Sequence, residues 1–380
     1  MRSFSFKLLI AGAVLLPCAF AMAQRPAGQS ELGPNAALQY WQAFAQMPAL
    51  SEEQQKILDE WSTVSLKDPA VEKLATEAHK SMMYLHRAAR LERCDWGLDY
   101  DDGVSLLLLH LPKARELARL AALHARYEME RGNSRALRDD AFGMMVLARH
   151  IGRDPAMICV LVRHLIEDMV VDLTAPYVPQ INAKYADSKA MFDSLPPSSS
   201  VLDTFDMERE YFLIWIVRKI KEEEKRDPGA GLELWINLLG PDAPRALKQI
   251  QSVDQAIKLT EGVIPVYDEL KKLVALPNAE FDAKYPDFNQ QNLKPDTLEA
   301  FLIPKIDELL AKERRSQARM AMLMAAIAVA DGGPDQLTNI DDPFGDGPFE
   351  YRKLDKGFEL KSQLQYEGQP VTVNFGPQNE

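Results

Sequence analysis

Apolar side chains recur at every third or fourth position along most of the chain, which is the spacing of one face of an α-helix. The clearest part is Pro112–Pro176, where three runs follow one another, at about 113–131, at 134–151 and from Asp154 onward. Glycines end the first two runs. Asp154 is the expected N-cap of the third helix, with Pro155 in its first turn. Short links join antiparallel helices, so the sequence predicts a mainly α fold, an irregular array of antiparallel helical hairpins.

The same spacing predicts further helices on both sides of that stretch. We expect them at about 35–46, from 51, at 69–93, at 105–111, from 203, at 232–239, at 244–276 and at 296–330. Pro265 should kink or divide the helix that contains it, and the polar stretch 277–295 indicates a long connection. The segment 194–200, SLPPSSS, is the expected boundary between an N-terminal helical array, 34–195, and a second helical region, 196–331.

The pattern changes after residue 331. Three short segments alternate apolar and polar side chains or carry β-branched and aromatic residues between glycine-containing turns, at 349–352, 357–360 and 371–375. We therefore expect a small antiparallel β-unit and a tail in the C-terminal region, 332–380.

The first residues carry the pattern of a secretory signal peptide. Arg2 and Lys7 precede an apolar run, 8–20, which is followed by the small-residue segment AMA. Cleavage after that segment makes 1–23 the signal peptide and 24–33 a flexible lead-in. The apolar run is too short to cross a bilayer comfortably, so we expect no membrane span after its removal. The predicted location is the periplasm, the cell envelope or the medium.

The formal net charge of the chain is −12, and loss of Arg2 and Lys7 with the signal peptide would make it more negative. A strongly acidic protein repels nucleic acid and anionic lipid, so we expect neither as a partner. Cations and basic proteins remain candidates. The charge also keeps an exported protein soluble, whatever its function.

Cys94 and Cys159 are the cysteines that would remain after cleavage. In an oxidising compartment they could form a disulfide, which stabilises by about 4 kcal/mol in the chain-entropy model for so long a loop. Alternatively, each is a small buried apolar residue. Sequence spacing does not decide between these two states.

One segment, 122–155, has the residue pattern of a known helical hairpin. Ala125 and Tyr127 precede a glycine turn, Ala136 and Phe142 lie on the next helix, and a proline closes the unit. This pattern resembles a tetratricopeptide repeat (TPR) hairpin. The repeat does not recur cleanly elsewhere, so the resemblance implies a TPR-like style of packing.

A second resemblance covers roughly the last seventy residues. An Ala-rich helix leads to Asp342-Pro343-Phe344, Gly347-Pro348-Phe349, Tyr351-Arg352 and Gly357-Phe358. This order resembles the C-terminal segment of uncharacterised exported proteins of planctomycete bacteria. It is also similar to the C-terminal region of type II secretion major pseudopilins. The pseudopilin N-terminal helix and the Ser-x-Gly-x-Asp-Gly ending are absent, so the resemblance implies a packing module and not a pilus subunit.

Aspartates beyond the last strand bind calcium in pseudopilins. The resemblance therefore makes Asp341, Asp342 and Asp346 calcium candidates. The alternative is a turn in which aspartate and glycine satisfy local backbone groups.

His79, Met82, Met83 and His86 fall at positions i, i+3, i+4 and i+7 of a predicted helix and therefore share one face. Imidazole nitrogen and thioether sulfur suit copper, particularly in an exported protein. The alternative is a core stripe in which methionine fills gaps and each histidine meets a polar partner. A single helix seldom supplies a whole coordination sphere.

The loop 94–103, CDWGLDYDDG, is acidic and aromatic. Its four aspartates are Asp95, Asp99, Asp101 and Asp102. They could hold calcium or act as paired catalytic carboxylates. With Gly103 at the sixth position of an EF-hand loop, leucines would occupy both ends, so that register fails. Asp102 would equally cap the helix that follows.

Familiar catalytic and cofactor patterns are absent, including HExxH, paired ExxH, CxxC, a Walker loop, GxSxG and SxxK. A triad assembled in space would leave no such pattern. We expect no cofactor, and the leading hypothesis is an exported, non-catalytic helical scaffold that binds a protein partner on its concave face. The first alternative is an exported, hydrolase-like all-α enzyme that uses the loop 94–103. The second is a copper- or calcium-binding envelope protein.

Overall fold

The computed structural model describes residues 33–181, 183–197 and 199–377. The expected signal peptide, 1–23, and the lead-in up to residue 32 lie outside the described residues. The chain divides into two units, Met1–Pro34 and Asn35–Glu380, and the description below concerns the second.

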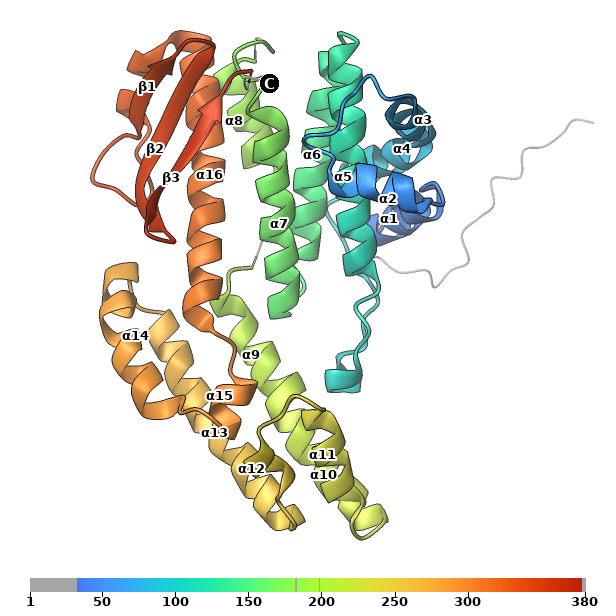
Figure 1. Cartoon of the computed structure of the whole chain (residues 1–380), viewed down its shortest axis with the longest axis vertical. Coiled ribbons are helices and arrows are strands. Elements are labelled where there is room, and N and C mark those ends of the chain that lie inside the picture. Colours follow the sequence, from blue (N-terminus) through green and yellow to red (C-terminus); the bar gives the residue numbers. More distant parts are fainter. Residues whose placement is uncertain (1–32, 182, 198, 378–380) are drawn as a thin grey trace, which may run out of the picture. The chain divides into compact units, whose positions relative to one another are not determined.

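The described part is mainly helical with a small three-stranded sheet at its C-terminal end, which confirms the predicted fold class (Figure 1). The first helices are α1 (Ala36–Ala45), α2 (Glu52–Asp59), α3 (Pro69–Glu77), α4 (His79–Ala88), α5 (His110–Glu130), α6 (Ser134–Ile151), α7 (Met157–Thr174) and α8 (Tyr185–Asp193). The later helices are α9 (Phe205–Glu208), α10 (Trp215–Arg226), α11 (Ala230–Leu239), α12 (Arg245–Lys248), α13 (Val253–Val274), α14 (Asn278–Asn292), α15 (Leu298–Leu302) and α16 (Ile306–Gly332). The strands are β1 (Glu350–Leu354), β2 (Gly357–Tyr366) and β3 (Gln369–Phe375). Among the described helices, none combines the length and apolar character that a membrane span requires.

Consecutive helices of the N-terminal half pack on one another, as expected for helices joined by short links. α5 packs on α6 and α6 on α7, while α4 contacts both α1 and α6 (Figure 1). The turn between α5 and α6 follows from two residues. Gly132 has φ +83°, and the Asn133 side chain caps α6 by accepting from the backbone N–H of Ala136 at 3.2 Å. The first hydrophobic core fills the space between these helices.

A second hydrophobic core lies among the helices of the later region. It draws its buried side chains mainly from the stretch between Val201 and Leu310, with Met157 and Val160 of α7 added. α16 contributes to both cores, because its first turns carry Ile306 and its later turns belong to the first core. α16 also packs on α7, α8, β2 and β3.

The sheet has the strand order β1-β2-β3, and both pairs are antiparallel. Residues of β2 alternate, so that Phe358, Leu360 and Ser362 are buried while their neighbours are less so. The strands therefore present one apolar face to α16, and the C-terminal β-unit predicted from alternation is present.

Two predictions around α5 and α7 are wrong. The expected apolar helix at 105–111 is absent, and a short 3₁₀ helix, η1 (Tyr100–Ser105), precedes α5 instead. An all-apolar run has no period that marks a face, and here Leu107 and Leu109 are 70% and 61% exposed. Asp154 does not cap α7, because Ala156 occupies the N-cap position and the Asp154 carboxylate accepts from Tyr100 instead.

One prediction about a proline-containing stretch is also wrong. The polar stretch expected as a connection at 277–295 contains α14, whose Phe281, Tyr285 and Phe288 are buried at helical spacing. Burial of these three aromatic side chains stabilises the helix although it contains Pro286. Pro265 was expected to kink or divide its helix, and α13 continues through Pro265 without being divided.

Candidate functional site

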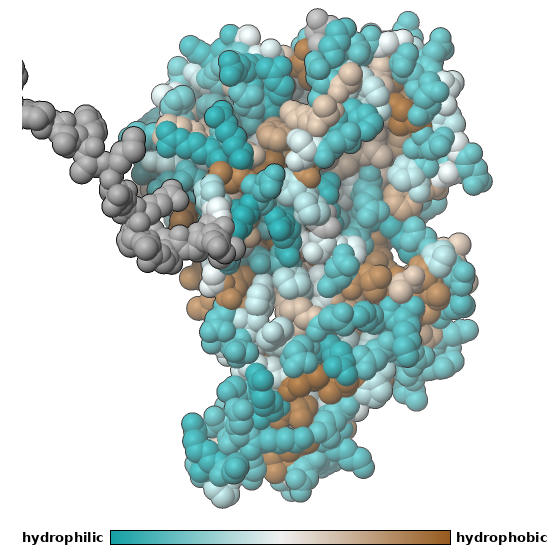
Figure 2. Space-filling view, turned by 180° about the vertical axis from the view of Figure 1, so that it is seen from behind, coloured by the Kyte–Doolittle hydropathy of each residue, from teal (hydrophilic) through white to brown (hydrophobic). Residues whose placement is uncertain are grey.

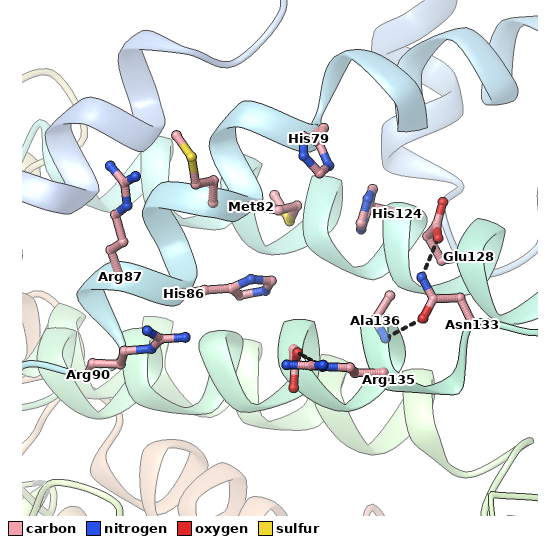
Figure 3. Close-up of a pocket in the computed structure, with 12 residues that line it drawn as sticks. His79, Met82, His86, Arg87, Arg90, His124, Glu128, Asn133, Arg135 and Ala136 are labelled. Carbon is pink, nitrogen blue, oxygen red and sulfur yellow. Dashed lines mark hydrogen bonds and ion pairs between the residues drawn. The ribbon is translucent and has the colours of Figure 1, made fainter.

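A pocket of about 610 Å³ lies among α4, α5 and α6 (Figure 3). Helix α4 and the turn after it contribute His79, Met82, Met83, His86, Arg87 and Arg90. Helix α5 contributes His124 and Glu128, and the start of α6 contributes Asn133, Arg135, Ala136 and Asp139. The volume is within the range of pockets that hold small molecules.

The local sequence explains why α4 forms one wall of this pocket. His79, Met82, Met83 and His86 share a helix face, and all four line the pocket. Figure 3 shows the imidazole rings of His79, His86 and His124 pointing into the space between the helices. The same face continues to Arg90, which lies one turn after His86 and was not among the predicted ligands.

A buried carboxylate forms hydrogen bonds with two of the three histidines. Asp140 is fully buried, and its two oxygens lie 2.7 Å from His86 Nε2 and 2.6 Å from His124 Nδ1. Each ring therefore contacts Asp140 through one nitrogen, and its other nitrogen has no hydrogen-bond partner among the described residues. Neither His124 nor Asp140 could be found from sequence spacing, because the three residues come from three different helices.

The Asp140 carboxylate also sets the charge of His124. Burial lowers the pKa of the His124 imidazole, but the hydrogen bond and negative charge of Asp140, aided by Glu128, outweigh it and raise the pKa above 6.5. The charged form of His124 is therefore more stable here than it is in a free imidazole.

The arginines of the pocket differ in their partners. Arg135 pairs with Asp139 at 3.3 Å, and Asn133 donates to Glu128 at 2.7 Å. Arg87 lies 5.2 Å from the centre of the Tyr84 ring. Among the described residues, no carboxylate pairs with the exposed guanidinium groups of Arg87 and Arg90. An acidic protein thus presents cationic groups at this pocket.

The two cysteines lie elsewhere, near a second polar cluster. Both are free thiols in the structure, with Cys159 buried and Cys94 half-buried. His110, Asp154 and Cys159 place one potential ligand atom each within 4.8 Å of the others, and they form the one such group of three found among the described residues. Burial lowers the pKa of His110 to about 4 and raises the pKa of Asp154 to about 6. Burial and the nearby Asp154 carboxylate raise the pKa of the Cys159 thiol, so it lacks the thiolate character of a nucleophile.

The four aspartates of the loop 94–103 do not converge on a pocket. All four are exposed. Asp95 accepts from the backbone N–H of Gly97 at 3.0 Å and lies 2.5 Å from Arg93. Asp99 accepts from the backbone N–H of Asp101 at 3.1 Å. The loop contributes to the interior through its aromatic residues instead, since Trp96 is buried.

The calcium candidates of the C-terminal segment have different environments. Asp342 is buried, and its carboxylate accepts from Ser362 Oγ at 2.8 Å and from the backbone N–H groups of Gln363 and Phe344 at 2.7 and 3.0 Å. Asp341 and Asp346 are exposed. The Asp342 carboxylate thus ties its turn to β2.

Apolar surface is distributed over several places. A groove of about 350 Å³ lies between α6, α7, α8 and α16, with Met145, Phe192 and Ile327 among its lining side chains. On the face that Figure 2 shows, hydrophobic side chains gather in separate patches within a mostly hydrophilic surface.

No protein-family model, curated protein or solved structure matches the chain.

Proposed function

We propose that the protein binds a small anionic ligand in the pocket formed by α4, α5 and α6. The observation that carries this proposal is the buried Asp140 carboxylate, which orients the rings of His86 and His124 beside two arginines without a carboxylate partner among the described residues. Guanidinium groups bind phosphate and carboxylate through paired, charge-assisted hydrogen bonds. The second nitrogen of the His124 ring adds a further polar group, since the first nitrogen contacts Asp140.

The apolar part of the pocket narrows the ligand class. Met82 and Met83 lie on the same wall as the histidines, and methionine packs adaptably against apolar groups. A ligand with one anionic group and a compact apolar body fits both the cationic and the apolar side chains of the pocket. An aryl phosphate and an aromatic carboxylate are examples.

Calorimetric titration with inorganic phosphate, phenyl phosphate and benzoate tests the proposal. Replacement of both arginines, Arg87→Gln with Arg90→Gln, should weaken binding at least about tenfold, a loss of about 1.4 kcal/mol. Arg245→Gln, at an exposed arginine on α12, is the matched control and should leave the affinity unchanged. Absence of binding by the wild type to all three probes, or equal affinity of the double variant, contradicts the proposal.

A hydrolytic role is the second candidate, and it is favoured by one observation. Two imidazoles oriented by one buried carboxylate can act as general acid and general base. Turnover of p-nitrophenyl phosphate that disappears in His86→Gln would support this role, whereas binding without turnover supports the binding protein. The hypothesis of a protein-binding scaffold stays a prediction, because the apolar groove and patches described above do not identify a protein partner.

A further inference from the structure

Two buried side chains and one half-buried side chain, from separate segments, meet beside the start of α5. His110 is the first residue of α5, Asp154 lies in the link between α6 and α7, and Cys159 lies in the first turn of α7. Their nitrogen, oxygen and sulfur atoms all lie within 4.8 Å of one another. The group is separate from the pocket of α4, α5 and α6, which none of the three lines.

Two of these ligand atoms are buried without a hydrogen bond. His110 Nε2 and Asp154 Oδ2 have no hydrogen-bond partner among the described residues, and His110 is only 1% exposed. They lie 3.7 Å apart, which is too long for a hydrogen bond to each other. Leaving a buried polar group unsatisfied costs about 1–3 kcal/mol, so two such atoms facing one thiol need a reason.

Neighbouring aromatic residues hold the group in place. Tyr100 donates a hydrogen bond to Asp154 Oδ1 at 3.1 Å, which leaves the other carboxylate oxygen toward His110. The Trp96 ring stacks on the His110 imidazole with 4.4 Å between ring centres. Such supporting contacts fix the orientation of ligands around metal ions in proteins.

We infer that His110 Nε2, Asp154 Oδ2 and Cys159 Sγ bind a zinc ion. Imidazole nitrogen, carboxylate oxygen and thiolate sulfur are the three ligand types that zinc takes in proteins, whereas calcium and magnesium prefer oxygen alone. With bonds of about 2.0–2.2 Å, nitrogen and oxygen ligands of a zinc tetrahedron lie about 3.3–3.6 Å apart, so the separation of 3.7 Å requires only a small approach of the two side chains.

The charges balance in this arrangement. Zinc binding replaces the proton of the Cys159 thiol, which is released to solvent, and the thiolate and the Asp154 carboxylate together neutralise the 2+ charge. The fourth position is left for water, because Cys94 is not part of the group. Asp154 is half-buried as a residue, whereas its Oδ2 atom, which faces His110, is buried.

Cobalt substitution provides the test. The full chain is stripped with a chelator and titrated with Co²⁺, and Zn²⁺ affinity is then measured by competition with a coloured chelator. We expect one Co²⁺ per chain with a thiolate-to-cobalt absorption band that Cys159→Ser abolishes. His110→Gln and Asp154→Asn should each weaken Zn²⁺ binding by more than about 100-fold, since even supporting residues contribute 10–100-fold.

Milder variants keep the test decisive if a ligand variant fails to fold. Tyr100→Phe removes only the hydrogen bond to Asp154 and should weaken Zn²⁺ binding about tenfold while the band persists. Cys94→Ser, close to Asp154, and Asp102→Asn, at an exposed aspartate of the same loop, are the controls and should leave the affinity unchanged. The inference is overturned if the wild type shows no band, if Cys159→Ser retains it, or if non-reducing mass spectrometry shows a Cys94–Cys159 disulfide.

Discussion

The indole nitrogen of Trp215 donates a hydrogen bond to the backbone carbonyl of Asp101 at 2.8 Å. The contact joins the start of α10 to the loop 94–103, across 114 residues of sequence. The Trp215 ring also lies against Gly103, at which an added Cβ would be 2.2 Å from a ring carbon. The acidic loop is therefore positioned by an aromatic residue of the second helical region.

Gly103→Ala should strongly destabilise the protein. Gly103 has φ +55° and ψ −125°, a sparsely populated conformation that costs a side-chain-bearing residue about 1–3 kcal/mol, and the new methyl group would displace the Trp215 ring in addition. We expect a total loss of about 3 kcal/mol or more in the free energy of unfolding, measured with urea.

Gly97→Ala is the control for the backbone effect alone. Gly97 has φ +70° and nothing within 4 Å of an added Cβ, so the substitution should lower the free energy of unfolding by about 1 kcal/mol. Equal effects of the two substitutions would show that the Trp215 contact contributes nothing.

Asp140→Asn should remove much of the support beneath the candidate pocket. The carboxylate lies within hydrogen-bond distance of two imidazoles, and hydrogen bonds to charged groups contribute about 1.5–3 kcal/mol each. Because asparagine retains one acceptor, we expect a loss of roughly 2–3 kcal/mol below pH 6.5. Asp139→Asn, next to it on the surface, should change stability by less than about 0.5 kcal/mol.

The pH dependence of that loss has a definite sign. His124 has a raised pKa in the folded protein, so its contribution to stability is fully present below pH 6.5 and is lost as pH rises through the folded-state pKa. The difference in unfolding free energy between wild type and Asp140→Asn should therefore shrink above pH 6.5. A difference that stays constant with pH would rule out this coupling. Nuclear magnetic resonance titration of the His124 ring supplies a direct check.

The sequence predicts best those helices whose ends are set by residues at the ends themselves. The boundary between α5 and α6 follows from Gly132 and Asn133, which act through their own backbone and side-chain geometry. The sequence pattern did not predict α14, because the exposed faces of this helix are polar and it contains Pro286. Whether its three aromatic residues are buried depends on packing against other helices, which local spacing does not report.

The candidate sites show the same division between local and spatial information. The shared face of His79, Met82 and His86 is a property of one helix and is visible in the sequence. The contacts of Asp140 with His86 and His124 join residues 54 and 16 positions apart, and those of Asp154 with Tyr100 join residues 54 apart. Such contacts arise only when helices pack, so spacing could not have predicted either group.

His150 should make the protein sensitive to acid. Burial, together with the charge of Arg153, lowers its pKa from 6.5 to about 4, and its Nδ1 lies 2.9 Å from the Tyr40 hydroxyl. The unfolded chain then binds more protons between these values, so this contribution to stability is full above pH 6.5 and falls as pH drops to about 4. The loss is no more than about 3 kcal/mol.

Comparison of variants isolates this effect from other titrating groups. The stability advantage of wild type over His150→Asn should decrease steadily as pH falls from 6.5 toward 4. Tyr40→Phe removes the hydrogen bond but leaves His150 buried, so it should keep the wild-type dependence on pH. An advantage over His150→Asn that is independent of pH would mean that burial of the neutral ring is not the cause.

The packing of α7 on α16 depends on a buried acidic side chain. Glu313 is 6% exposed, accepts from the backbone N–H of Val201 at 3.1 Å, and lies 3.6 Å from Arg163 and 3.7 Å from His164. Removing one charge from a buried ionic network is strongly destabilising, because the opposite charge is left less compensated in a medium of low polarity. Arg163 keeps Glu167 at 3.3 Å, so Glu313→Gln should cost no more than about 3 kcal/mol. Glu308→Gln, which breaks an exposed pair with Lys305 on the same helix, should cost less than about 0.5 kcal/mol in the same urea measurement. If both substitutions had equally small effects, the Glu313 charge would contribute little, and other contacts such as the pairs of Arg315 and Arg319 with Asp168 would hold α7 against α16.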